Sequence, residues 1–194
     1  MKKVIATAKC YESGCGGTME GRKGEYRYRE SGLNSVVLKD ILVFHCTKCN
    51  AVVPEIPAAG VLHRVIALRL LWKKTLLTGG ELRFLRKLIG YSVTEFGKIM
   101  GSPKSVVSRW ENHNLHGDGT DRIVRLLVTV KLIAEIAGQP DTILKNVTVE
   151  ELTTEVEKSL KLIQARRANE KYEIPPEEIA RLGGGEVAHE VPMN

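Results

Sequence analysis

Four cysteines near the start of the chain constrain its fold more than any other feature. They form two pairs, Cys10 with Cys15 and Cys46 with Cys49, and residues 50–194 contain no further cysteine. The gap within each pair is short, and thirty residues separate the pairs. Such spacing is the usual way to bring four thiolates around one tetrahedral metal ion. The sequence therefore predicts that all four cysteines bind one structural Zn²⁺ ion.

Other uses of the cysteines compete with this prediction. Structural disulfides are disfavoured in a reducing cytoplasm. We expect the chain there because its apolar stretches are interrupted by charge and its N-terminus lacks a secretory leader. A redox Cys46–Cys49 pair would need a βαβ context and would leave the first pair without a role. His45 could replace a cysteine as ligand. A closed site of four thiolates leaves no position for water, so we do not expect a catalytic metal.

Strand patterns lie between the two cysteine pairs. Residues 25–29 alternate in polarity, residues 36–45 are rich in β-branched and aromatic side chains, and residues 31–34 are typical of a turn. The sequence therefore predicts a small β zinc ribbon over residues 1–58. A unit of this size buries little apolar surface, so the metal would supply much of its folding free energy.

Helical signals dominate from residue 59 to residue 140. We expect a connecting helix over residues 59–77. Capping boxes at Thr78–Glu81 and Ser92–Glu95 open two short helices, and Ser102 caps a third that has proline at its first position. A longer fourth helix is predicted to bury the residues Ile123, Leu126, Leu127, Val130, Ile133 and Ala134. This pattern predicts an all-α helix-turn-helix domain over residues 78–140.

The third of these helices has a divided surface. Its outward arc holds short polar groups and long cations but no carboxylate, and it consists of Lys104, Ser105, Ser108, Arg109 and Asn112. Such a face suits the major groove of double-stranded DNA, where arginine, lysine and serine contact base edges and phosphates repel acids. A solvated helix face is the alternative. Residues 61–140 carry 13 basic and 6 acidic side chains, which favours an anionic partner.

The last third of the chain gives weaker signals. A capping box at Thr148–Glu151 opens an amphipathic helix within an extension over residues 141–172. That helix either packs on its own domain or forms a dimer contact, and its short apolar stripe favours packing. Residues 173–194 are predicted to form a flexible tail with one short helical turn.

The segments 82–92, 95–96 and 107–112 resemble the Xre/Cro-type, lambda repressor-like helix-turn-helix. Together with the upstream cysteine ribbon, residues 8–137 resemble the MqsA (YgiT-type) antitoxin family. The resemblance implies a structural zinc ribbon that binds a toxin protein and a helix-turn-helix domain that dimerises on operator DNA. It also implies that Arg109 reads a base. Ser105 replaces the asparagine of the family, which implies a different operator sequence.

These observations predict a cytoplasmic, sequence-specific DNA-binding regulator that acts as a homodimer and has no membrane partner. The resemblance implies that it is an antitoxin of a type II toxin–antitoxin pair and represses its own operon. A stand-alone zinc-ribbon regulator without a toxin is the alternative. The sequence contains no nucleophile triad, paired-carboxylate site or phosphate-binding glycine loop, so we do not expect an enzyme.

Overall fold

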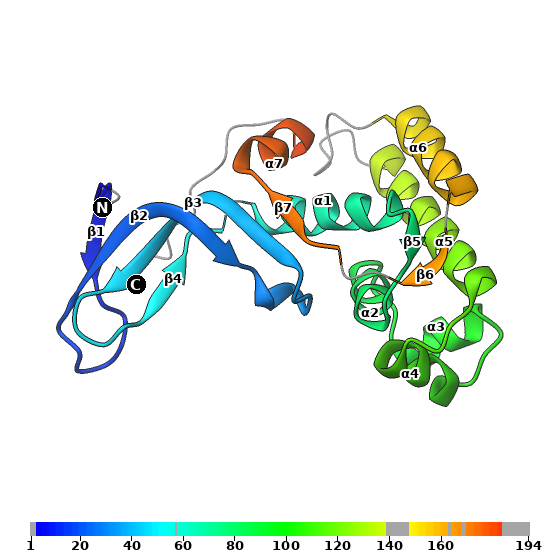
Figure 1. The fold of residues 1–194 in the computed structure, drawn as a ribbon, viewed down its shortest axis with the longest axis horizontal. Helices are drawn as coiled ribbons and strands as arrows, with labels where there is room; N and C mark the ends of the chain where they lie inside the picture. The colour runs from blue at the N-terminus through cyan, green and yellow to red at the C-terminus, as the bar shows by residue number, and fades with distance from the viewer. Residues whose placement is uncertain (1–2, 57, 139–147, 163, 168–169, 184–194) are drawn as a thin grey trace.

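A computed structural model of the chain describes all residues except 1–2, 57, 139–147, 163, 168–169 and 184–194. The large sheet lies at one end of the molecule and most of the helices lie at the other, with helix α1 between them (Figure 1). One hydrophobic core nevertheless runs through both ends, from Leu38 of the sheet through Ile66 of α1 to Val128 in the helical part. None of the helices in the described residues combines the length and hydrophobicity that a membrane span requires.

The sheet contains four antiparallel strands and one parallel strand. The antiparallel order is β1 (Ala6–Lys9), β2 (Thr18–Arg27), β3 (Val36–Cys46) and β4 (Val52–Pro54), with a short 3-10 helix η1 (Arg29–Ser31) between β2 and β3. β7 (Tyr172–Ile174) pairs in parallel with the start of β3, where Val36 lies opposite Tyr172. β3 contributes more buried residues to the sheet than any other strand, because its β-branched residues meet both the neighbouring strands and α7. The sheet therefore includes a strand from far along the chain.

Helix α1 (Ala59–Leu71) is the centre of the core rather than a simple connector. Leu62, Val65, Ile66, Leu68 and Leu70 are completely buried, because α1 contacts both α2 and α7. The predicted connecting helix extended to residue 77, but α1 ends at Leu71 and a short strand, β5 (Thr75–Leu76), follows. β5 pairs in parallel with β6 (Gln164–Arg167).

Four helices follow β5: α2 (Gly79–Leu88), α3 (Val93–Ile99), α4 (Lys104–His113) and α5 (Asp118–Gly138). The predicted capping boxes of α2 and α3 are confirmed, because Thr78 and Ser92 each accept a hydrogen bond from the amide three residues later. The predicted cap of α4 is wrong. Pro103 is its N-cap residue and forms no side-chain cap, while its carbonyl accepts from the amides of Val106 and Val107.

Two glycines allow these helices to approach closely. A Cβ atom on Gly79 would lie 2.4 Å from the carbonyl oxygen of Glu111, where α2 begins against α4. A Cβ atom on Gly97 would lie 2.5 Å from the carbonyl oxygen of Ser102, in the turn between α3 and α4. Both distances are too short for any other residue without movement of the backbone. These glycines therefore set the packing of α4 on α2 and α3.

The face of α5 that enters the core differs from the prediction. Val124, Val128 and Leu132 are buried, together with Arg125. The residues predicted to be buried include three that are largely exposed: Ile123 (54%), Leu126 (48%) and Val130 (62%). α5 is apolar on two faces, and the face that carries Arg125 lies inside because its guanidinium finds buried partners.

The C-terminal third also differs from the prediction in part. α6 (Val149–Leu162) packs against α5 through Leu152 and Val156, as the apolar stripe indicates. The sequence predicts a flexible tail from residue 173, yet β7 and α7 (Pro176–Gly183) are packed elements. Ile174, Ile179 and Leu182 are buried against the sheet and α1, and this burial holds them in place. Residues 184–194 of the predicted tail lie outside the described residues.

Candidate metal centre and candidate nucleic-acid interface

The four cysteines lie together at the end of the sheet, which confirms the cluster that the sequence predicts. All four sulfur atoms lie within 4.8 Å of one another. Cys10 lies 3.5 Å from Cys49, and Cys15 lies 3.6 Å from Cys46, so each close contact joins one residue of each pair. The cluster could hold a metal ion, and His45 is not part of it.

The backbone around the cluster is shaped to surround sulfur. A Cβ atom on Gly17 would lie 2.7 Å from the Cys46 sulfur and 3.2 Å from the Cys15 sulfur, so only glycine leaves room there. Backbone amides of Cys49 and Lys48 donate toward Cys46 and lower the pKa of its thiol to about 6. A hydrogen bond from the Glu12 backbone lowers the pKa of the Cys10 thiol, but desolvation and the neighbouring thiols together raise it to about 12. Four thiols this close together cannot all lose their protons unless a cation compensates the negative charges. Such a cluster is typical of a metal site.

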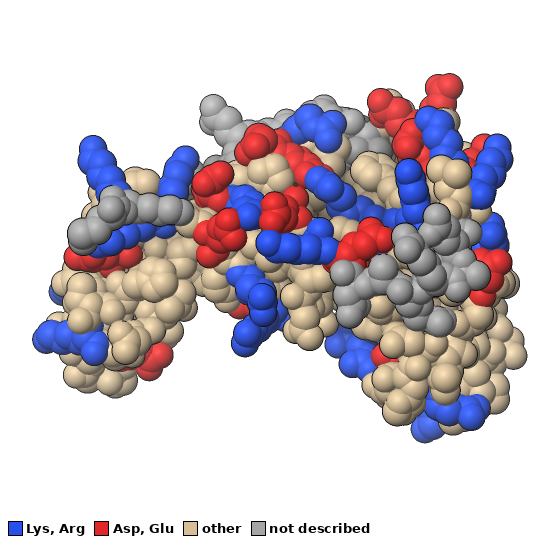
Figure 2. All heavy atoms as spheres, viewed as in Figure 1, with Lys and Arg blue, Asp and Glu red and all other residues tan. Residues whose placement is uncertain are grey.

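The second candidate site is the outer face of α4. Lys104, Ser105, Arg109 and Asn112 are exposed and Ser108 is half-buried, while Val107 on the opposite face is fully buried. The structure therefore places all five predicted residues on one side of one helix. In Figure 2, acidic side chains gather over α7 and β7, whereas the end formed by α3 and α4 carries mostly basic and uncharged side chains.

A buried ion pair holds α4 in place. Glu111 lies on the inner side of α4 with its side chain 4% exposed, and Arg86 of α2 donates to both of its carboxylate oxygens at 2.5 and 3.1 Å. Arg86 also donates to the carbonyl oxygen of Tyr91 at 2.6 Å. Because the one carboxylate on this part of α4 is turned inward and neutralised, the outer face keeps its positive character.

Sequence reasoning missed two groups of residues, of which the first reaches this face. Arg83 of α2 donates to both Glu111 and Asn112, and so joins the outer face from a neighbouring helix. Asp121 and Arg125 of α5 form a fully buried ion pair where α1 ends and β5 begins, with 2.6 Å between Arg125 Nε and Asp121 Oδ1. An arginine in the middle of an apolar helix was the only signal in the sequence for this pair.

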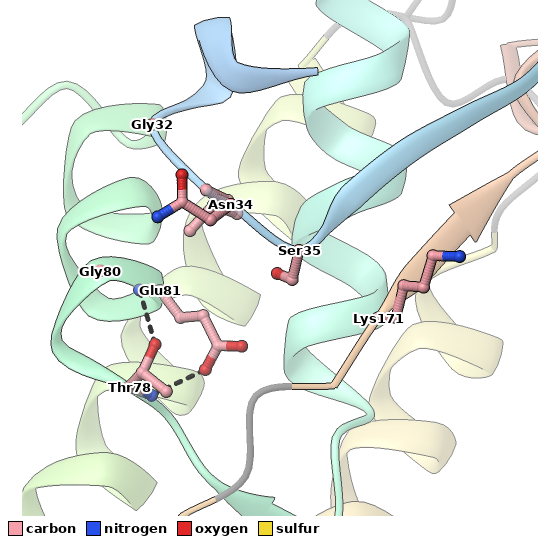
Figure 3. Close-up of a pocket in the computed structure, with 8 residues that line it drawn as sticks. Gly32, Asn34, Ser35, Thr78, Gly80, Glu81 and Lys171 are labelled. Carbon is pink, nitrogen blue, oxygen red and sulfur yellow. Dashed lines mark hydrogen bonds between the residues drawn. The ribbon is translucent and has the colours of Figure 1, made fainter. Parts of the chain in front are cut away.

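A cavity of about 370 Å³ lies where the loop after η1 meets the start of α2 and Lys171 (Figure 3). Glu81 lines it, but the Glu81 carboxylate already accepts hydrogen bonds from Lys73 at 2.8 Å, from the Thr78 amide at 2.7 Å and from the Tyr172 hydroxyl at 3.1 Å. These bonds cap α2 and tie β7 to it. The carboxylate that lines the cavity therefore has a structural role, and we assign no ligand to the cavity.

Comparison of the chain with protein-family models, with curated proteins and with solved structures finds no match.

Proposed function

We propose that the protein is a sequence-specific DNA-binding transcriptional regulator that acts as a homodimer and contains one structural Zn²⁺ ion. The observation that carries the proposal is the outer face of α4. It combines cations and short polar groups, and the one carboxylate of α4, Glu111, is buried against Arg86. Such a face can enter the major groove without repelling phosphates.

The arrangement of α3 and α4 supports a helix-turn-helix. α3 is seven residues long and packs on α4 across the short turn from Met100 to Pro103. In a helix-turn-helix the second helix lies in the groove and its N-terminal residues reach base edges. Lys104, Ser105, Ser108 and Arg109 occupy that position on α4.

The geometry of the cysteine cluster supports zinc. Four sulfurs about 2.3 Å from a tetrahedral Zn²⁺ ion would lie about 3.8 Å from one another. The Cys10–Cys49 and Cys15–Cys46 sulfur distances, 3.5 and 3.6 Å, lie near this value, and all four sulfurs lie within 4.8 Å of one another. Bound zinc would fix the loops after β1 and β3 to one another and so hold that end of the sheet together.

The exposed stripe on α5 supports a homodimer. Ile123, Leu126, Val130 and Ala134 are exposed at successive turns, which makes an apolar strip about 16 Å long at about 1.5 Å per residue. A two-fold axis brings the same patch of two copies together, so a second copy of the chain can cover this strip with an identical one. The same symmetry would present two α4 helices to half-sites about one DNA turn apart.

A toxin partner is the more specific part of the proposal. The resemblance to the MqsA antitoxin family supports a toxin partner. With such a partner, the regulator would be an antitoxin that represses its own operon. A stand-alone regulator of the same architecture needs no such partner. Co-expression with the product of the neighbouring gene separates the two. Co-purification and relief of growth arrest support the antitoxin, whereas the absence of both results supports the stand-alone regulator.

The DNA-binding function is tested with a fluorescent duplex from upstream of the gene and a shuffled duplex of equal length. We expect the protein to prefer the upstream duplex and Arg109→Ala to lose about 1–3 kcal/mol of that preference. Arg22→Met, which removes a positive charge from the sheet, serves as the matched control. Equal affinity of the wild-type protein for both duplexes would contradict the proposal.

A further inference from the structure

Arg83 lies on α2, yet its side chain reaches the outer face of α4. Its Nη2 donates to Oδ1 of Asn112, and its Nε donates to Glu111 Oε2 at 3.3 Å. Asn112 in turn donates from Nδ2 to the hydroxyl of Ser108 at 3.2 Å, one helical turn earlier. A chain of hydrogen bonds therefore joins α2 to two of the side chains that face outward from α4.

These bonds fix which way the Asn112 amide faces. A guanidinium group only donates hydrogen bonds, so the amide must turn its oxygen toward Arg83. The nitrogen then faces Ser108, and exchanging the two atoms would set an amide N–H₂ group against the guanidinium. One amide hydrogen and one oxygen lone pair remain after both bonds are made. Asn112 therefore presents one donor and one acceptor in a single orientation, which is what recognition of one base edge requires.

We propose that Arg83 is a positioning residue for base recognition: it orients the Asn112 amide from outside the recognition helix, and base preference at one operator position depends on it. This inference rests on the proposed DNA-binding function. The Arg83 side chain is only 41% exposed, and its guanidinium group already donates hydrogen bonds to Glu111 and Asn112. Its positive charge is thus directed at α4, and its effect passes through Asn112.

Removal of Arg83 leaves the anchor of α4 intact. Glu111 keeps both of its hydrogen bonds from Arg86, so it is not left as an unpaired buried charge. Arg83→Met retains the aliphatic part of the side chain and removes only the guanidinium. We therefore expect the variant to fold, and its circular dichroism spectrum checks this.

The test begins with selection of a binding site from random double-stranded DNA by the wild-type protein. Asn112→Ala identifies the base position whose preference depends on Asn112. We expect Arg83→Met to reduce the preference at that same position about fivefold or more and to leave the other positions unchanged. In the Asn112→Ala background, Arg83→Met should have no further effect on preference. Arg22→Met, with the same change of charge, should leave every position unchanged.

Different results separate the possible failures. If Arg83→Met weakens binding to all sequences equally and lowers the salt dependence of binding by about one counterion, Arg83 contacts a phosphate and the inference is wrong. Preference that survives in Arg83→Met, or that does not depend on Asn112, also overturns it. If the wild-type protein selects no site at all, the proposed DNA-binding function fails first.

A second measurement needs no DNA. In the free protein, the side-chain amide resonances of Asn112 report its hydrogen bonds by NMR. We expect them to shift in Arg83→Met and to keep their wild-type positions in Arg22→Met. Unchanged Asn112 amide resonances in Arg83→Met would mean that Arg83 does not orient this side chain.

Discussion

Replacement of Arg125 by methionine should destabilise the protein more than any other single change of a charged side chain on α5. The Arg125 guanidinium is completely buried and donates five hydrogen bonds. Four go to backbone carbonyls where α1 ends and β5 begins, at 2.7–3.0 Å from Leu70, Leu71, Lys73 and Thr75. The last goes to Asp121, whose other oxygen accepts from the Leu77 amide at 2.6 Å.

The magnitude follows from what the substitution leaves behind. Removing one partner of a buried ion pair costs about 3–5 kcal/mol because the other charge stays unpaired. The four carbonyls also lose their donor, because methionine has no N–H group to offer in its place. We therefore expect Arg125→Met to lower the free energy of unfolding by about 4 kcal/mol or more, which is a large part of the roughly 5–15 kcal/mol typical of a domain.

Urea unfolding of the metal-loaded protein, followed by circular dichroism, measures this loss. Arg122→Met is the matched control on the same helix, because Arg122 forms a partly exposed pair with Asp118 and should cost about 1 kcal/mol or less. The double variant Asp121→Asn with Arg125→Met should lose less than the two single losses added together. A loss below about 1 kcal/mol for Arg125→Met would refute the reasoning, whereas absence of any cooperative transition would agree with it.

Three further predictions concern other parts of the fold. Gly97→Ala should destabilise the protein by about 1–3 kcal/mol in urea unfolding, because the added Cβ meets the Ser102 carbonyl; the usual helix-propensity gain of about 1 kcal/mol would contradict this. Desolvation lowers the pKa of His63, so folding loses stability as the pH falls through 6.5 toward that lowered pKa, and His63→Gln should show a smaller loss between pH 7.5 and 5.5. If the free energy of unfolding depends on pH equally in His63→Gln and in the wild-type protein, His63 does not cause this loss. Leu126→Asp should shift the proposed dimer toward monomer in sedimentation equilibrium, because a charge would enter its apolar interface; a variant that dimerises as the wild-type protein does would contradict this interface.

Local signals in the sequence predicted the parts of the structure that depend on neighbouring residues. The spacing of the cysteines predicted their cluster, because two short knuckles on adjacent strands meet at one end of a sheet. The capping boxes at Thr78 and Ser92 marked the starts of α2 and α3. The 3.6-residue period predicted which side chains of α4 point outward.

Features that depend on distant residues were not predicted. α5 has apolar residues on two faces, and periodicity favoured the face with Leu126 over the face that holds Arg125. Only the carbonyls at the end of α1 show why the arginine face is the buried one. β7 is three residues long and pairs with a strand more than 130 residues earlier, which no local pattern indicates. Arg83 is an ordinary surface arginine in the sequence, and its role depends on contact between α2 and α4.

Binding of DNA by the outer face of α4 can be followed residue by residue in an NMR titration. Backbone and side-chain resonances of the metal-loaded protein are followed as a duplex carrying the selected site is added. We expect the largest shifts on Lys104, Ser105, Arg109 and Asn112, and we expect a duplex of random sequence to give weaker shifts that vanish at higher salt. Shifts that leave α4 unchanged, or that fall only on the sheet, would contradict DNA binding by this face.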